Sequence, residues 1–155
     1  MSAEMLKLRA KDAEDIEVIS AVLQDSIVPV CDMAFQQETK SFIVVAQRLR
    51  REGPGDEATE RICCALTING VVSVQTHGID LHHHERMLDL LAIMPDSTQK
   101  SLSLIFAGDA RIRLALESWG AVVEDFGASW PALCHPHHED LLSERSSSDT
   151  ARNAS

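Results

Sequence analysis

After residue 25 the apolar residues of this chain recur at every second position, which is the period of a β-strand and not of a helix. The clearest case is a pair of stretches, residues 101–107 (SLSLIFA) and 110–117 (ARIRLALE). Gly108 and Asp109 lie between them and are typical of a two-residue hairpin turn. This alternation predicts that most of the chain forms antiparallel sheet.

A single helical pattern precedes the alternation. Ile16, Ile19 and Leu23 have the spacing of one helix face. Asp12 is the predicted N-cap, and the acidic residues that follow it occupy the first turns, where the helix dipole favours negative charge. We therefore expect one helix over about residues 13–24.

Further strands are predicted from the same alternation. Residues 26–35 indicate a strand in which Pro29, which lacks an amide hydrogen, requires an edge position or a bulge. The strand expected over residues 41–50 is apolar on both faces from Phe42 to Ala46, as in a strand that is buried on both sides at its start. The other strands are expected at residues 5–10, 87–94 and 120–126.

The stretch 61–77 allows two structures. Residues 61–67 and 71–77 flank Ile68-Asn69-Gly70, and Asn-Gly is a strong signal for a two-residue hairpin. The alternative is one long strand that is bent by a bulge at Gly70. The hairpin is the favoured prediction.

Together these elements predict an α+β fold, in which one N-terminal helix packs on a mostly antiparallel sheet of about eight strands. So much sheet is expected to curl into a roll or partial barrel, with the helix covering one opening. Parallel β-α-β order is excluded, because no second helix is available for the crossover.

A chain of 155 residues is expected to form one domain, here residues 1–130. Residues 131–155 are polar and rich in His and Ser, which predicts an irregular C-terminal tail that is disordered toward its end. Trp130 is expected to pin this tail over a sheet edge.

The formal net charge of −10 argues against nucleic acid as a partner, because such binding depends on neutralised phosphates. No run of roughly 20 apolar residues could cross a membrane, and no signal peptide is visible. Four sparse cysteines, of which Cys63 and Cys64 are adjacent, fit free thiols in a reducing compartment better than a disulfide framework. We therefore expect a cytoplasmic protein.

Histidine is concentrated near the C-terminus, in the sequence CHPHH. His135, His137 and His138 are the candidate metal ligands, since imidazole is a common ligand of zinc. Further ligands would have to come from residues such as His82–His84. Neither cluster has the spacing of a zinc finger or a catalytic zinc site. The favoured interpretation is solvated histidine without a physiological metal, and no cofactor is expected.

Five arginines form a second candidate site. Arg48, Arg50 and Arg51 lie at a strand end, and Arg111 and Arg113 share the outer face of the last hairpin. If these strands were neighbours, the arginines would form a patch for RNA or an acidic partner. The chain has no Tyr to stack on bases, however, and edge-strand charges that block aggregation are the alternative.

No catalytic residues are predicted. The chain contains neither a Gly-x-Ser-x-Gly nucleophile elbow nor a phosphate-binding glycine loop. Glu124 and Asp125 are adjacent, and adjacent side chains on a strand point to opposite faces. We therefore expect them to form a solvated rim and not an acid–base pair.

Several stretches have a distinctive sequence when taken together: residues 12–35, GID at 78–80, LIFAGDARIRLALE at 104–117 and EDFGASW at 124–130. As a set they resemble a proteobacterial family of uncharacterised cytosolic proteins, domain of unknown function 2948, over about residues 5–130. The resemblance implies a small bacterial cytosolic protein and carries no activity, cofactor or partner.

The function predicted from these observations is that of a non-enzymatic protein-binding or scaffolding domain with an unknown protein partner. Two alternatives stay open. One is a metal-binding protein that uses the C-terminal histidines, and the other is binding of RNA or an acidic partner through the arginine patch.

Overall fold

The computed structural model describes residues 5–50, 60–98 and 100–127. None of the helices in these ranges has the length and apolarity needed to cross a membrane. The domain boundary predicted at residue 130 and the tail beyond it lie outside them. In chain order the elements are β1 (Lys7–Ala10), α1 (Ala13–Leu23), β2 (Ser26–Pro29), the 3-10 helix η1 (Val30–Asp32), β3 (Met33–Gln36), β4 (Ser41–Arg50), β5 (Glu60–Asn69), β6 (Val71–His77), β7 (Met87–Pro95), β8 (Ser101–Phe106), β9 (Ala110–Leu116) and β10 (Ala121–Gly127).

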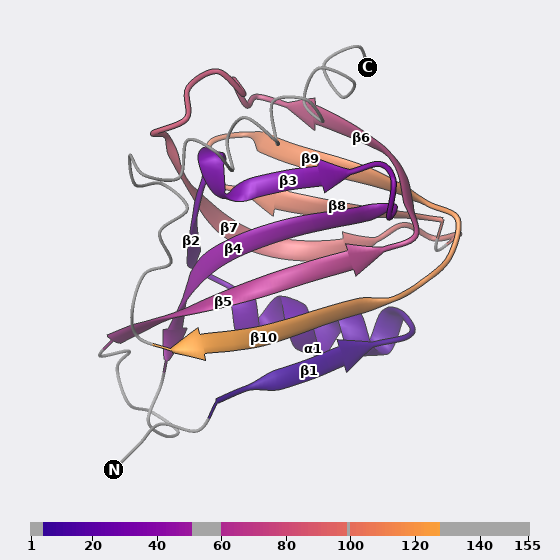
Figure 1. Cartoon of the computed structure of the whole chain (residues 1–155), viewed down its shortest axis with the longest axis horizontal. Helices are drawn as coiled ribbons and strands as arrows, with labels where there is room; N and C mark the ends of the chain where they lie inside the picture. Colours follow the sequence, from indigo (N-terminus) through magenta and orange to yellow (C-terminus); the bar gives the residue numbers. More distant parts are fainter. Residues whose placement is uncertain (1–4, 51–59, 99, 128–155) are drawn as a thin grey trace.

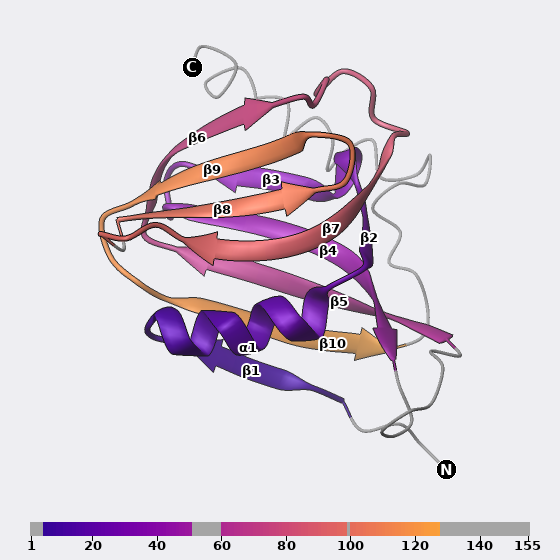
Figure 2. The same cartoon turned by 180° about the vertical axis from the view of Figure 1, so that it is seen from behind.

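Every strand pair in the described ranges is antiparallel, and the ten strands form one sheet in the order β1-β10-β5-β4-β2-β7-β8-β9-β6, with β3 also paired to β4. The sheet folds into two facing layers, one with β3, β4, β5, β10 and β1, the other with β7, β8, β9 and β6 (Figures 1 and 2). Apolar side chains from both layers form one core. The predicted α+β class is confirmed, and the sheet is a roll that does not close into a barrel.

The stretch predicted as a hairpin at 61–77 is instead one bent strand, so the favoured prediction was wrong and its alternative was right. β5 pairs with β4 and β10, whereas β6 pairs with β9 in the other layer. The bend lies at Gly70, which has a φ of +76°. A type I′ hairpin turn requires positive φ at both central residues, and Asn69 does not have it.

A second strand turns the same corner. β9 continues through residues 117–120 into β10, alongside the bend between β5 and β6. Two backbone hydrogen bonds join the bends, from Asn69 N to Gly120 O and from Glu117 N to Gly70 O, both at 2.8 Å. A continuous two-stranded ribbon, β5–β6 with β10–β9, therefore connects the two layers.

The hairpin predicted from residues 101–117 is confirmed, with a longer turn than expected. β8 ends at Phe106 and β9 begins at Ala110, so three residues form the turn. Gly108 and Asp109 both have positive φ, +80° and +63°. The glycine signal at Gly108 therefore marks a true hairpin, whereas the one at Gly70 marks a bend within a continuing strand.

The strand predicted over residues 26–35 is broken into two. β2 ends at Pro29, whose ring nitrogen cannot donate to a neighbouring strand, and η1 follows before β3 begins. β3 stays paired with β4, while β2 pairs with both β4 and β7. The break at Pro29 thus allows β2 to join the two layers along one side.

Helix α1 begins as predicted and closes one side of the roll. Asp12 is the N-cap, and its carboxylate accepts from Asp15 N at 2.9 Å. The predicted apolar stripe faces the core. Ser20 Oγ accepts a hydrogen bond from Ile93 N at 2.9 Å, on the edge of β7 beyond the part that pairs with β2. The helix therefore takes the place of a further strand beside β7, and it also packs against β1 and β4 (Figure 2).

We predict that Gly70→Ala destabilises the fold more than Gly108→Ala does. Both positions have positive φ, but a Cβ at Gly70 would lie 2.6 Å from Ser118 O, whereas nothing lies within 4 Å of one at Gly108. Overpacking costs about 1–3 kcal/mol, which is the expected difference in the free energy of unfolding. Urea denaturation of the two variants measures it, and equal losses would mean that the corner is not tightly packed.

Candidate functional site

A buried ion pair joins two strands that are not neighbours in the sheet. Arg48 on β4 and Asp125 on β10 lie on either side of β5. The guanidinium donates from Nε to Oδ1 at 2.9 Å and from Nη2 to Oδ2 at 2.8 Å. The Asp125 side chain is fully buried, and that of Arg48 is 12% exposed. The hydrogen bonds that Arg48 donates to Asp125 raise the pKa of Arg48, and this effect outweighs the opposite effect of burial, so this arginine stays charged.

The carboxylate of Asp125 also holds the first strand in place. Leu6 N donates to Asp125 Oδ2 at 2.8 Å, and Asp125 N donates to Leu6 O at 2.9 Å. With the two bonds from Arg48, three donors satisfy the carboxylate, and its charge is not left unpaired in the interior. The ion pair therefore ties β1, β10 and β4 together at one end of the roll.

Two free, buried cysteines lie beside the ion pair on β5. Cys64 is the direct partner of Asp125 in the β10–β5 ladder. Burial raises the pKa of the Cys64 thiol to about 12, and the charge of Asp125 adds to this increase. Burial also raises the pKa of Cys63. Both thiols are protonated at neutral pH and serve as packing groups, as predicted, because the thiolate is the reactive form. The expectation of free thiols does not hold for Cys31 in η1, which is disulfide-bonded.

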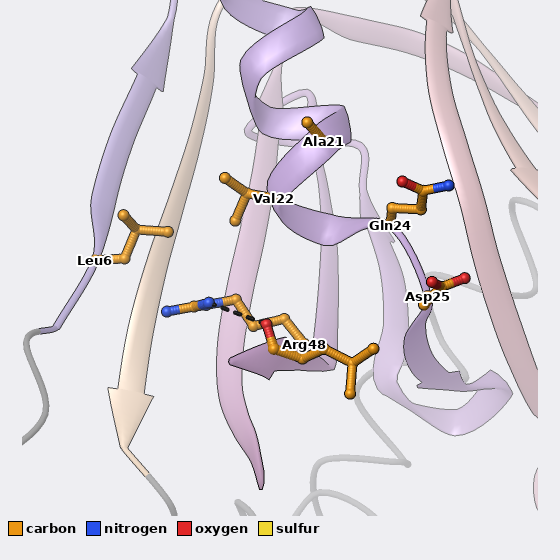
Figure 3. Close-up of a pocket in the computed structure, with 7 residues that line it drawn as sticks. Leu6, Ala21, Val22, Gln24, Asp25 and Arg48 are labelled. Atoms are coloured by element: carbon orange, nitrogen blue, oxygen red, sulfur yellow. Dashed lines mark hydrogen bonds between the residues drawn. The ribbon is translucent and has the colours of Figure 1, made fainter. Parts of the chain in front are cut away.

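A groove opens above this end of the sheet, between the last turn of α1, the start of β1 and the end of β4 (Figure 3). In Figure 3 the Arg48 side chain runs below Val22 toward Leu6, and Gln24 and Asp25 lie on the other side. The groove has a volume of about 290 Å³ and is lined by Leu6, Ala21, Val22, Gln24, Asp25, Arg48 and Leu49.

The helix end that borders the groove is anchored to both layers of the roll. Asp25 has a φ of +68°, which turns the chain sharply after α1. Its N–H donates to Leu90 O on β7 at 2.7 Å, and its carbonyl accepts from Arg61 Nη1 on β5 at 3.0 Å. The same nitrogen donates to Gln47 O at 3.0 Å. One wall of the groove therefore has a fixed position relative to its floor.

Of the five arginines predicted to form a patch, the three whose side chains are described lie on strands that are not neighbours. Arg48 is occupied by Asp125, and β2, β7 and β8 separate its strand from β9. Arg111 and Arg113 are exposed on β9, where Arg113 Nη2 donates to Ser101 Oγ at 3.2 Å. Arg50 ends β4, and Arg51 lies outside the described residues.

The candidate metal ligands His135, His137 and His138 also lie outside the described residues, so the metal site there stays a prediction. His82–His84 are exposed in the loop before β7. Residues 5–50, 60–98 and 100–127 contain no group of three His, Cys, Asp or Glu side chains placed to hold a metal ion.

The sequence interpretation missed Asp125, which it placed on a solvated rim with Glu124. Glu124 is exposed, but Asp125 points inward with Ala121 and Val123, and all three are buried. The alternation of the strand could have shown this, because Asp125 falls at the same face as the apolar residues Ala121 and Val123. The groove had no comparable signal, because its lining comes from three elements whose packing is not visible in the sequence.

Comparison with known proteins gives one match. The model of a family described as "Protein of unknown function (DUF2948)" matches residues 6–138. No curated protein and no solved structure matches. The match covers the ion pair and the groove, and it continues for eleven residues beyond Gly127, the last residue of β10 (138 − 127).

We predict that Arg48→Met lowers the free energy of unfolding by about 3–5 kcal/mol, because it leaves the Asp125 carboxylate buried without its counter-ion. Urea denaturation measures the loss. The double variant Arg48→Met/Asp125→Asn should lose less, since no charge is stranded. Arg111→Met, at an exposed arginine, is the control and should change stability by less than about 0.5 kcal/mol. Equal effects at Arg48 and Arg111 would contradict the prediction.

We also predict a loss of stability at alkaline pH that depends on Cys64. The folded thiol keeps its proton up to a pKa of about 12, whereas the unfolded thiol releases it near 9.0. Stability is therefore complete below pH 9 and falls between pH 9 and 12, by up to about 1.4 kcal/mol per pH unit. Urea denaturation from pH 8 to 11, under reducing conditions, should give a steeper decline for the native chain than for Cys64→Ala. If the free energy of unfolding falls equally with pH in the native chain and in Cys64→Ala, the Cys64 thiol has the same pKa in the folded and unfolded states.

Proposed function

The chain belongs to the DUF2948 family, a family of proteins of unknown function, and we propose that it acts as a non-enzymatic protein-binding domain. The observation that carries this proposal is the groove at the end of α1, where apolar walls meet a polar floor held by the Arg48–Asp125 pair. Its ligand is an extended segment of a partner protein.

The groove offers the chemical groups that a peptide requires. Leu6, Val22 and Leu49 provide apolar contacts for a side chain. Gln24 and Asp25 provide acceptors for backbone N–H groups. Of the five N–H bonds of a guanidinium, Arg48 uses three on Asp125 and Leu49 O within the described residues, which leaves two to donate to a peptide carbonyl. An extended peptide presents all of these complements along one line.

The size and composition of the groove favour binding over catalysis. A volume of about 290 Å³ is at the lower limit of small-molecule sites, which span about 300–1,000 Å³, and it suits one or two side chains of a partner. None of the seven lining residues is Cys, His or Ser, and Asp25 is the only carboxylate among them. The charge of Arg48 is neutralised by Asp125 and is not directed at a substrate.

We place this function in the cytoplasm. The acidic composition favours solubility, and the sparse cysteines do not form a disulfide framework: Cys63 and Cys64 are free, whereas Cys31 is disulfide-bonded.

We predict that a photo-crosslinking amino acid at position 21 captures a protein partner in the producing cells, whereas the same amino acid at position 17 does not. Ala21 and Glu17 are both exposed on α1, but only Ala21 lines the groove. Mass spectrometry of the crosslinked product identifies the partner. Equal capture at both positions, or none at position 21, would contradict a groove-directed interaction.

With the captured partner purified, we predict that Ala21→Trp weakens its binding at least tenfold, because the indole fills the groove. That factor corresponds to about 1.4 kcal/mol. Glu17→Trp places the same bulk outside the groove and should leave the dissociation constant unchanged. Titration calorimetry on the three full-length proteins measures the difference, and undiminished binding by Ala21→Trp would exclude the groove as the contact site.

A further inference from the structure

The face of the sheet that points away from the core is apolar at the centre of β4 and β5, between Gln47 at one end and Thr67 at the other. Side chains at alternate positions of these strands, such as Val44 and Leu66, belong to the core. The intervening positions on the outer face include Ile43, Val45, Cys63 and Ala65. A solvated face of an antiparallel sheet is normally polar, so two apolar faces are typical of strands that are covered on both sides.

Burial at the centre of this outer face agrees with a cover. Val45 is 4% exposed and Cys63 is 1% exposed, although neither belongs to the core between the layers. The only α-helix of the described residues packs on the opposite side, against β7 and β1, and Figure 1 shows the outer face of β4 and β5 without it. The 3-10 helix η1 contacts β4, and its Asp32 lies near enough to Cys63 for its charge to add to the increase that burial causes in the pKa of that thiol. A single turn of three residues is too short to cover both strands, which leaves room for a further element.

The course of the chain after β10 identifies the nearest candidate. Gly127, the last residue of β10, is the direct partner of Cys63, at a β-bulge that breaks the register after Asp125. The last described residue of β10 therefore lies beside the buried thiol. Eleven extended residues reach about 36 Å, whereas β4 is only two strand spacings from β10, about 10 Å. The chain is long enough to cross the face.

The sequence of the segment fits an apolar surface. Residues 128–134 read ASWPALC and contain Trp130 and Leu133, whereas residues 135–140 (HPHHED) are polar. The family model also continues through residue 138, so these residues belong to the matched domain, unlike residues 139–155.

We propose that residues 128–138 pack across the outer face of β4 and β5, with Trp130 and Leu133 over Val45 and Cys63. This intramolecular docking surface is separate from the groove and does not depend on the proposed function. It makes the C-terminal part of the family domain a second cover of the sheet, opposite α1.

Two neighbouring thiols provide the test. Cys63 lies under the proposed cover, and Cys64 faces the core. In the full-length, reduced protein we expect Trp130→Asp to speed modification of Cys63 by a maleimide at least tenfold, while Cys64 stays protected. Leu141→Asp, the same change outside the matched domain, is the control and should behave like the native chain. Tandem mass spectrometry assigns the modified thiol.

Equal rates at Cys63 in the native chain and in Trp130→Asp would overturn the proposal. If Trp130→Asp exposes both thiols, the variant has unfolded, and a second measurement decides. A photo-crosslinking amino acid at position 132 of the otherwise native chain should then link to residues 43–47 or 61–65 of the same molecule. Links only to a second molecule, identified with mixed heavy and light isotope-labelled protein, would mean that another copy covers the face and would refute the intramolecular contact.

Discussion

The corner at Gly70 is the constraint on which the rest of this structure depends. Two strands, β5–β6 and β9–β10, turn there together and pass from one layer to the other. The layers are therefore joined by main-chain hydrogen bonds and not only by packed side chains. The same crossing places β10 beside β5, which brings Asp125 within reach of Arg48. The ion pair at the far end of the roll is a consequence of the bend at the near end.

The ion pair in turn shapes the groove. Asp125 binds both Arg48 and the backbone of Leu6, so a single carboxylate positions one wall and the floor. Removing a buried charge from its partner is costly, and such pairs restrict the arrangements that a fold can adopt. Here the pair sets the distance between β1 and β4, two strands that have no hydrogen bonds with each other.

Features that depend on neighbouring residues could be predicted from the sequence, and features that depend on strand order could not. The helix over residues 13–23 and the turn at Gly108 are local, and both were predicted closely. Asn69-Gly70 carries an equally strong local signal for a hairpin, but pairing with β9 and β10 overrides it. The predicted arginine patch assumed that β4 and β9 were neighbours, whereas β2, β7 and β8 lie between them in the sheet.

The fixed position of α1 has a consequence for how a ligand would be recognised. Ser20 and Asp25 bond it to β7, and Arg61 bonds the chain after it to β5, so the helix cannot shift without breaking bonds in both layers. A ligand would therefore meet a preformed shape and would not lose affinity to the ordering of a mobile wall. Induced fit is correspondingly restricted. Discrimination among ligands would depend on side-chain size, because α1 cannot move to make room for a bulky residue.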